Sequence, residues 1–454
     1  MNGVTVNAGA TATVQIAGVG GLPATGLASV WLNVASRAPA DGSGALTVYP
    51  SGSTTPAATG ARYQHVGWNQ DLLLVKVGSD GRILMKNQGP DASAAKVYSD
   101  VYGYTLTSAG ATAGSSYVGV SPARIASDLS VVAGGSTTFE VLGKGGVPAA
   151  GVSHVAFTLT GNSTGPTKLV AHPSGTPTPT DLANLDLWTA THRENLVLIP
   201  VGADGKVTIA NIGAYPATIF ADVSGYYASP SATLAGSVTH ALQPARYGGS
   251  VNIPSDGSYT LSPLGTNGVP AGGVTAVALN LAMRSTGTGF LRVYPSGETL
   301  PPTRTATYPD ANLHHAGFVA TKLGSDGKIV IKNWRNGAVT VEFDVYAYFT
   351  PSTGCTQATA AAAGPAPVPA PRSVEIEKKS ATVTQVQGPT GTVTKLGYDF
   401  SGRQVRQSDG LGRTSRTDFD AFGRLVAESD LRPDGTKLRG QTYTHDPDGN
   451  LIAA

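Results

Sequence analysis

The feature that most constrains the fold is a sequence pattern that returns three times at nearly equal intervals. The pentapeptide VYPSG occupies residues 48–52, and its counterparts are AHPSG at 171–175 and VYPSG at 293–297. The steps from Tyr49 to His172 to Tyr294 are 172 − 49 = 123 and 294 − 172 = 122 residues. This period exceeds the about 20–50 residues of solenoid repeats, so each copy is predicted to be a domain with its own core.

Two other motifs keep the same period and divide the chain. They are VGSDG, VGADG and LGSDG at 77–81, 201–205 and 323–327, and DVYGY, DVSGY and DVYAY at 100–104, 222–226 and 344–348. We assign the three repeats to residues 1–112, 113–235 and 236–352. SPAR (121–124) and QPAR (243–246) open the second and third repeats. The first repeat is expected to lack this leading strand, and the chain to be a fragment of a longer, exported protein.

Each repeat is predicted to be a β-sandwich. In GVSHVAFTLT (151–160), Val155, Phe157 and Leu159 alternate with smaller or polar residues, which indicates a half-buried strand. Pro-Ser-Gly is predicted to end a strand, and the Asp-Gly motifs to form hairpin turns. We count seven to nine short strands per repeat and no helical periodicity, with a closed barrel as the alternative fold.

The last hundred residues differ in composition. Residues 353–373 form a Pro/Ala-rich linker that contains Cys355, the single cysteine of the chain, and residues 374–454 form a further β segment. In that segment YDFSGRQVRQ (398–407) and FDAFGRLVAES (419–429) place an Asp three residues before a Gly. Such a turn joins two strands, so residues 396–429 are predicted to form antiparallel hairpins with Asp399 and Asp420 at equivalent turns.

Both parts of the chain resemble known families. GVPAGGVTAVALNL, GFLRVYPSG, NLVLIPVGADGKVTI and ADVSGYY resemble a repeat of exported and cell-surface proteins from high-GC Gram-positive bacteria. That resemblance implies an exported, modular, all-β protein and no catalytic residues. The tail resembles the YD repeats of RHS proteins, which implies a piece of a β-sheet that spirals into a shell, although this run is too short to enclose anything.

Composition limits the partners of the chain. A formal net charge of +2 without a dense basic patch gives no basis for nucleic-acid binding. No stretch reaches the roughly 18 apolar residues of a membrane span, and the N-terminus lacks the pattern of a signal peptide. One cysteine permits no internal disulfide and no Cys-rich zinc site, and each Asp-Gly turn offers one carboxylate, too few for calcium. We predict no metal and no cofactor, and leave the oligomeric state open.

The candidate site residues lie in the most variable stretch of each repeat. THREN (191–195) contains His192 and Glu194, and the aligned positions of His192 in the other repeats hold Trp68 and His314. Flat rings can stack on sugars, so we expect weak glycan contact from Trp68, His192, His314, Arg62, Arg193 and Tyr308.

These residues suggest two functions. The first is a non-enzymatic stalk or adhesion module of an RHS-repeat protein at the cell surface, which binds cell-wall polysaccharide or further YD-repeat sheet. The alternative is an accessory or unrecognised glycan hydrolase with a cluster around His192.

Overall fold

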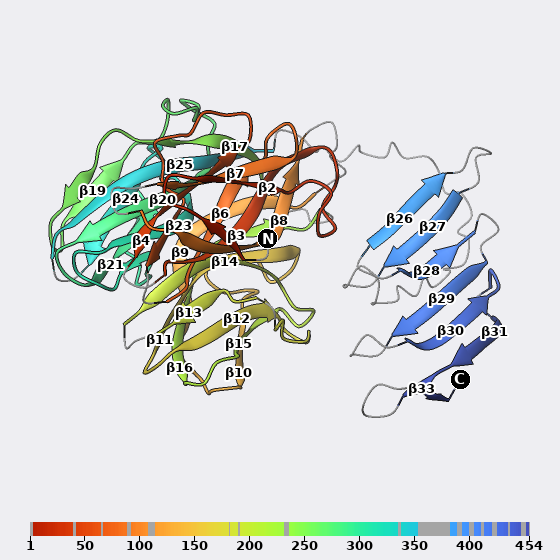
Figure 1. Ribbon diagram of the computed structural model, residues 1–454. Helices are drawn as coiled ribbons and strands as arrows, with labels where there is room; N and C mark the ends of the chain where they lie inside the picture. The colour runs from red at the N-terminus through yellow and green to blue at the C-terminus, as the bar shows by residue number, and fades with distance from the viewer. Residues whose placement is uncertain are drawn as a thin grey trace. The chain divides into compact units, whose positions relative to one another are not determined.

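The computed structural model is all-β, with every element of regular structure a strand or an isolated bridge among the residues that it describes (Figure 1). Those residues are 3–39, 42–64, 67–88, 92–107, 114–180, 182–188, 191–230, 236–334 and 337–352, then 382–387, 393–398, 404–409, 413–419, 425–434, 436–445 and 451–453. The chain divides into two compact units, Met1–Ala358 and Thr359–Ala454. Across the described ranges there is no helix with the length and apolar character to cross a membrane.

The first repeat is a sandwich of two four-stranded antiparallel sheets, in the orders β1-β8-β3-β6 and β2-β7-β4-β5. Its strands are β1 (Val4–Val6), β2 (Thr11–Gln15), β3 (Leu27–Arg37), β4 (Ser43–Pro50), β5 (Ala61–Gln64), β6 (Asn69–Lys76), β7 (Arg82–Gln88) and β8 (Ala95–Leu106).

The second repeat has the same two layers, in the orders β14-β11-β16-β9 and β10-β15-β12-β13. Its strands are β9 (Ser116–Val131), β10 (Ser136–Glu140), β11 (Val152–Ser163), β12 (Thr167–Pro173), β13 (Leu185–Leu187), β14 (Arg193–Pro200), β15 (Lys206–Asn211) and β16 (Ala217–Ala228).

The third repeat repeats the arrangement, with β17, β25, β20 and β23 in one layer and β19-β24-β21-β22 in the other, while β18 pairs with β25. Tyr117 of β9 pairs with Ser237 of β17, so one sheet continues from the second repeat into the third. The strands are β17 (Ser237–Arg246), β18 (Val251–Ile253), β19 (Ser258–Leu261), β20 (Ala276–Ser285), β21 (Gly289–Pro295), β22 (Ala306–Tyr308), β23 (His314–Lys322), β24 (Ile329–Trp334) and β25 (Val339–Pro351).

The β-sandwich architecture and the turn chemistry predicted from the sequence are confirmed. Strands β4, β12 and β21 each end on the proline of the Pro-Ser-Gly motif, which places Tyr49, His172 and Tyr294 at equivalent strand ends. The glycines of the three Asp-Gly turns, Gly81, Gly205 and Gly327, have φ of 76°, 78° and 74°. These values lie in the left-handed region that glycine adopts without steric cost, so the turns depend on it.

One expectation about the strands was wrong, because β11 is buried on both faces instead of one. Val155, Phe157 and Leu159 enter the core of their own sandwich, as the alternation predicts. Ala156, on the opposite face, joins a cluster that also contains residues of the first and third repeats. The second face of the strand is therefore covered by neighbouring repeats rather than by water.

The three repeats also pack against one another, in addition to the core that each was predicted to have. Trp31 donates a hydrogen bond from its indole Nε1 to the Tyr227 hydroxyl at 2.8 Å and packs edge-on against Phe318. Phe318 packs in turn against Tyr346, while the Tyr117 hydroxyl donates to a backbone oxygen of the third repeat. Aromatic side chains of three repeats thus share one buried centre, and in Figure 1 the red-to-orange, yellow and green-to-cyan parts lie against one another.

The second unit is a separate sheet with strand order β26-β27-β28-β29-β30-β31, followed by a small sheet of β32 and β33. Antiparallel pairing of β27 with β28 and of β29 with β30 confirms the predicted hairpins. The turn residues Asp399 and Asp420 lie outside the described residues, as does the predicted linker 353–373 with Cys355. The strands are β26 (Thr382–Gln387), β27 (Val393–Tyr398), β28 (Gln404–Ser408), β29 (Thr414–Phe419), β30 (Leu425–Leu431), β31 (Lys437–Thr442), β32 (Thr444–His445) and β33 (Leu451–Ala453).

Candidate functional site

Three equivalent loops, those that precede β5, β13 and β22, join the repeats into a closed ring. The loop of the first repeat reaches the third, where the Thr59 backbone N–H donates to Asp344 at 2.8 Å. The loop of the third reaches the second, where the Arg304 N–H donates to Asp222 at 2.7 Å. The loop of the second reaches the first, where Asn33 donates its side-chain N–H to the Ala183 oxygen at 3.3 Å. Because each contact is made head to tail by the same loop, the ring closes after three copies.

Two buried ion pairs hold the receiving end of this ring. Arg124 donates from Nε and Nη2 to the two carboxylate oxygens of Asp222 at 2.8 and 2.9 Å. Arg246 makes the same two-pronged contact with Asp344 at 2.8 and 3.1 Å. Each Arg belongs to the Pro-Ala-Arg motif of a leading strand, so the motif fixes the carboxylate that accepts the incoming loop.

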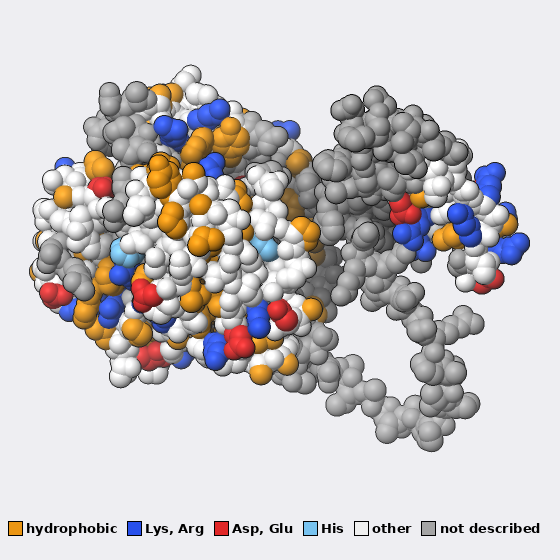
Figure 2. Space-filling model, turned by 90° about the horizontal axis from the view of Figure 1, so that it is seen from below, with side chains coloured by type: hydrophobic (Ala, Val, Ile, Leu, Met, Phe, Trp, Pro, Cys, Tyr) orange, Lys and Arg blue, Asp and Glu red, His pale blue; other side chains and the backbone are white. Residues whose placement is uncertain are grey.

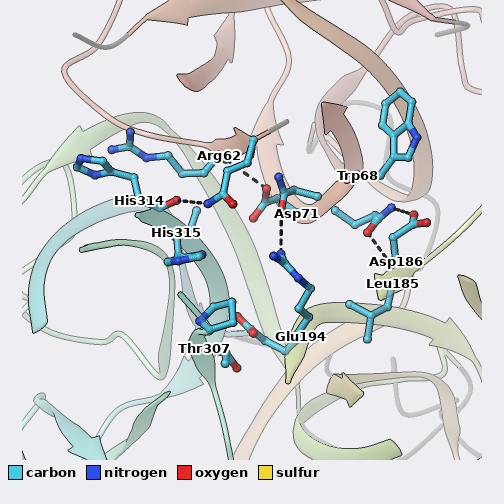
Figure 3. Close-up of a pocket in the computed structure, with 15 residues that line it drawn as sticks. Arg62, Trp68, Asp71, Leu185, Asp186, Glu194, Thr307, His314 and His315 are labelled. Atoms are coloured by element: carbon cyan, nitrogen blue, oxygen red, sulfur yellow. Dashed lines mark hydrogen bonds between the residues drawn. The ribbon is translucent and has the colours of Figure 1, made fainter. Parts of the chain in front are cut away.

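A small polar cavity lies where the starts of β6, β14 and β23 meet, and its volume is about 40 Å³. Figure 3 shows Arg62 and Asp71 of the first repeat, Glu194 of the second and His315 of the third around the same space. Nearby, the Leu72 backbone N–H donates to Asn195 Oδ1 at 2.9 Å, which ties two repeats together. The cavity is large enough for a few water molecules but not for a sugar ring.

Four of the six predicted contact residues line this cavity. They are Arg62 and Trp68 of the first repeat, Arg193 of the second and His314 of the third. Arg193 is buried, with its guanidinium 3.3 Å from the ring centre of Trp188 and its Nη1 donating to Asn69 Oδ1 at 3.1 Å. Three repeats therefore supply the group, each from an equivalent stretch of sequence.

The other two predicted residues lie elsewhere. Tyr308 is fully buried and donates its hydroxyl hydrogen to Asn333 Oδ1, so the expectation that it contacts glycan was wrong. The cause is its place on β22, where the side chain enters the core of the third sandwich. His192 does not line the cavity and instead lies against Phe220, with ring centres 6.0 Å apart.

Burial dominates the electrostatics of the cavity. It raises the pKa of the Glu194 carboxyl to about 7 and that of Asp186 to about 6, and it raises the pKa of Asp71 well above its ordinary value. It also lowers the pKa of His315 to about 3 and that of Arg193 to about 10. Each shift disfavours the charged form, as expected for ionisable groups removed from water.

Several polar atoms around the cavity lack a hydrogen-bond partner among the described residues. They include Arg62 Nε, Arg193 Nε, Gln64 Oε1 and Asn69 Nδ2. Within the described residues, no three His, Cys, Asp or Glu side chains are placed to bind one metal ion.

Sequence reasoning missed the groups that carry the ring contacts. Asp222 and Asp344 appear in the repeated DVxxY motif, and Arg124 and Arg246 in the repeated Pro-Ala-Arg motif. The separation is the same in both repeats, 222 − 124 = 98 and 344 − 246 = 98 residues. This constant separation of opposite charges is the signal that could have identified the pairs.

Comparisons with known proteins place no family name on the chain. No protein-family model matches it, and no curated protein matches it. A solved structure described as the atomic structure of Sulfolobus Turreted Icosahedral Virus is similar over 74% of this chain and 83% of that chain, with 10% sequence identity and a TM-score of 0.16. A score this low supports no conclusion about fold or function.

Proposed function

We propose that residues 1–352 form a non-enzymatic module of the cell surface that carries the C-terminal YD-like ribbon and binds cell-wall glycan at the mouth of the central cavity. The observation that carries this proposal is the convergence of Arg62, Trp68 and His314 from two different repeats at one place. All three side chains are partly exposed there. Rings and guanidinium groups at a polar opening are suited to the faces and hydroxyl groups of sugars.

The surface supports a neutral rather than a highly charged ligand. On the face of the first unit drawn in Figure 2, charged side chains are scattered among uncharged and hydrophobic ones. The formal net charge of the whole chain is +2. Attraction led by charge would require a stripe or patch of one sign, so contact with polysaccharide is favoured over contact with nucleic acid.

The closed ring supports a carrier role. Loops, ion pairs and an aromatic centre connect all three repeats, and a connected body resists bending better than domains joined by linkers. A glycan held at the junction would contact two repeats at once. The module would therefore present the ribbon from a rigid base rather than from a flexible stalk.

Retention on purified cell-wall polysaccharide at physiological salt tests this proposal. The wild-type chain should be retained, and Trp68→Ala should reduce retention at least fivefold. Trp334→Ala is the matched control, because Trp334 is also partly exposed and stacks on Arg292, but it does not line the cavity. Circular dichroism should confirm that both variants fold. No retention of the wild type would reduce the module to a structural carrier. Retention that Trp68→Ala leaves unchanged would show that glycan does not bind at the cavity.

The alternative is a glycan hydrolase, and the raised pKa values of Glu194 and Asp186 are the observation in its favour. Against it, burial accounts for these shifts, and the cavity admits no sugar between the carboxyl groups. His192, the other member of the predicted cluster, lies outside the cavity. Glycan turnover that falls at least a hundredfold in both Glu194→Gln and His192→Ala would establish the hydrolase instead.

A further inference from the structure

We propose that Arg37 and Lys96 of the first repeat bind an acidic group, a carboxylate or a phosphate, on the glycan that contacts Trp68. This subsite depends on the proposed function, since it takes the same glycan, and it adds the chemical class of that ligand. The two cations lie beside the central cavity rather than in it, because neither residue lines the cavity and Trp68 stands at its edge (Figure 3).

The pairing of β3 with β8 places the two cations side by side. Arg37 lies opposite Lys96, and two residues further along the strands Ala35 lies opposite Tyr98. Because side chains alternate between the two faces of a sheet, these four residues share one face. The residue between them on β8, Val97, points the other way into a buried cluster. Arg37 and Lys96 are both exposed, so their charges meet at the surface of the first repeat.

The two cations have no acidic neighbour that would offset their repulsion within the described residues. Like charges directly opposite each other weaken a sheet. No ion pair between described residues includes Arg37 or Lys96. The acidic residue on the same face of β8, Asp100, lies four residues further along the strand, about 13 Å away at about 3.3 Å per residue. The site therefore keeps a local positive charge, which an anion from solution would neutralise.

The other two repeats show that the fold does not require this pair of charges. Counted from the repeated DVxxY motif, the positions of Arg37 and Lys96 correspond to Asn162 and Thr218 in the second repeat and to Arg284 and Thr340 in the third. These strands form the same pairs with no charge or with one. The double positive charge is therefore a feature of the first repeat alone, as expected for a ligand contact rather than for a part of the sandwich.

Aromatic rings connect the two cations to the glycan contact at Trp68. The ring centres of Trp68 and Tyr98 are 5.2 Å apart in an edge-to-face arrangement. The Lys96 ammonium nitrogen is 5.6 Å from the Tyr98 ring centre, so it lies no further from the Trp68 ring centre than the sum of the two distances, 10.8 Å. The chain at Gly3 holds the other end of Tyr98, because a Cβ at Gly3 would meet the Tyr98 hydroxyl oxygen at 3.0 Å. An acidic group on a sugar against Trp68, or on the next sugar, therefore reaches Lys96.

The equivalent rings of the second repeat are covered by the protein itself. His192 and Phe220 occupy the positions of Trp68 and Tyr98, with ring centres 6.0 Å apart. The Arg304 guanidinium of the third repeat lies 5.3 Å from the Phe220 ring centre, and Phe220 is only 8% exposed. Trp68 and Tyr98 are both partly exposed. Of these two equivalent sites, the first repeat therefore has the surface that a ligand can reach.

The two cations suit an isolated acidic group. Neighbouring strands are about 4.8 Å apart, so Arg37 and Lys96 can both donate to the oxygen atoms of one carboxylate or phosphate. The planar guanidinium offers two parallel N–H groups, and the ammonium adds a compact point charge. A net charge of +2 for the whole chain favours a glycan with separate acidic groups over a densely charged polymer.

Calorimetric titration of the intact 454-residue chain tests the subsite with three probes: an oligosaccharide of uronic acid, its carboxyl-reduced neutral form, and an oligomer of glycerol phosphate. At least one acidic probe should bind about tenfold more tightly than the neutral form. The double change Arg37→Gln and Lys96→Gln should remove this preference and leave binding of the neutral form unchanged. The double change Arg284→Gln and Lys144→Gln is the control, because it removes the same charge from exposed positions in the other two repeats, and it should keep the preference.

The outcomes separate the subsite from the proposed function. Acidic and neutral probes that bind the wild type equally, or a preference that survives Arg37→Gln with Lys96→Gln, would overturn the subsite, while loss of cell-wall retention in Trp68→Ala would still support the glycan site. No binding of any probe would overturn the subsite as well. A preference for the uronic acid probe would identify a carboxylate, and one for the glycerol phosphate probe a phosphate. Raising the salt concentration should reduce the preference of the wild type, because exposed charges are screened.

Discussion

The ion pair between Arg246 and Asp344 is the contact whose loss should most weaken the ring. Asp344 is fully buried and accepts two hydrogen bonds from Arg246 and a third from the Thr59 backbone N–H. The change Asp344→Asn keeps the shape of the side chain but removes its charge and one acceptor oxygen. It acts at the point where the first repeat meets the third.

The expected loss in free energy of unfolding follows from these contacts. Breaking a buried ion pair by removing one partner costs about 3–5 kcal/mol. Arg246 is 22% exposed and keeps Glu342 at 2.7 Å, so the lower end, about 3 kcal/mol, is expected. Since about 1.4 kcal/mol corresponds to a factor of ten, the folding equilibrium constant should fall by about a hundredfold.

Urea unfolding followed by tryptophan fluorescence and by circular dichroism measures this loss. Trp31 is buried at the junction of the repeats and reports on its opening. Asp128→Asn is the control, because Asp128 is exposed and Asn tolerates its positive φ of 52°, and it should change stability by less than about 0.5 kcal/mol. A similarly small effect of Asp344→Asn would refute the reasoning. Two separate unfolding transitions, one for the first repeat and one for the third, in the wild type would also refute the reasoning.

Three further predictions concern the cavity, the loops and the ribbon. Because burial raises the pKa of Glu194 from 4.5 to about 7, the stability contributed by its protonated carboxyl is present below about pH 4.5 and is lost as the pH rises through 7. The free energy of unfolding of Glu194→Gln should therefore increase relative to the wild type by about 3 kcal/mol between pH 4.5 and 8, at about 1.4 kcal/mol per pKa unit, in urea titrations. A difference that stays constant with pH would contradict this. Gly145→Ala should lower the free energy of unfolding by at least about 2 kcal/mol more than Gly20→Ala. Both glycines have positive φ, but only a Cβ at Gly145 would meet neighbouring atoms. Equal losses in thermal melting would show that Gly20 does not face open space. Residues 374–454 expressed alone should show weak amide protection, because every residue of β31 is exposed, and strong protection throughout would make the ribbon an independent domain.

Much of the fold could be predicted because its signals are local. Alternation along β11 and β20, the proline at each Pro-Ser-Gly strand end and the glycine of each Asp-Gly turn depend only on neighbours in sequence. Such preferences are the same whether the repeats are separate or joined. The sandwich layers followed from them, and the hairpins of β27–β28 and β29–β30 did as well.

The candidate site was only partly predictable, because it forms between repeats. Trp68 and His314 were found from their alignment with His192, and Arg62 from its place in the same variable stretch; the structure brings these three residues to one cavity. Tyr308 has the same ring chemistry and lies in the same variable stretch, yet it points into a core. Which of these side chains faces the cavity depends on strand orientation at β22 and on the neighbouring repeats, and neither has a signal in a short motif.

The sequence by itself determined that this protein consists of three related β-sandwiches and a ribbon of antiparallel hairpins. Only the tertiary structure decided that the three sandwiches close into a ring. The sheet faces that meet between the sandwiches carry polar or small residues in the sequence, which gives no sign that they are buried. The first repeat has Trp31 where the others have Ala156 and Ala278, and all three side chains enter one buried cluster. A centre shared by three equivalent positions has room for a single large side chain when the other two are small. That complementarity is a property of the assembled repeats and of no repeat alone.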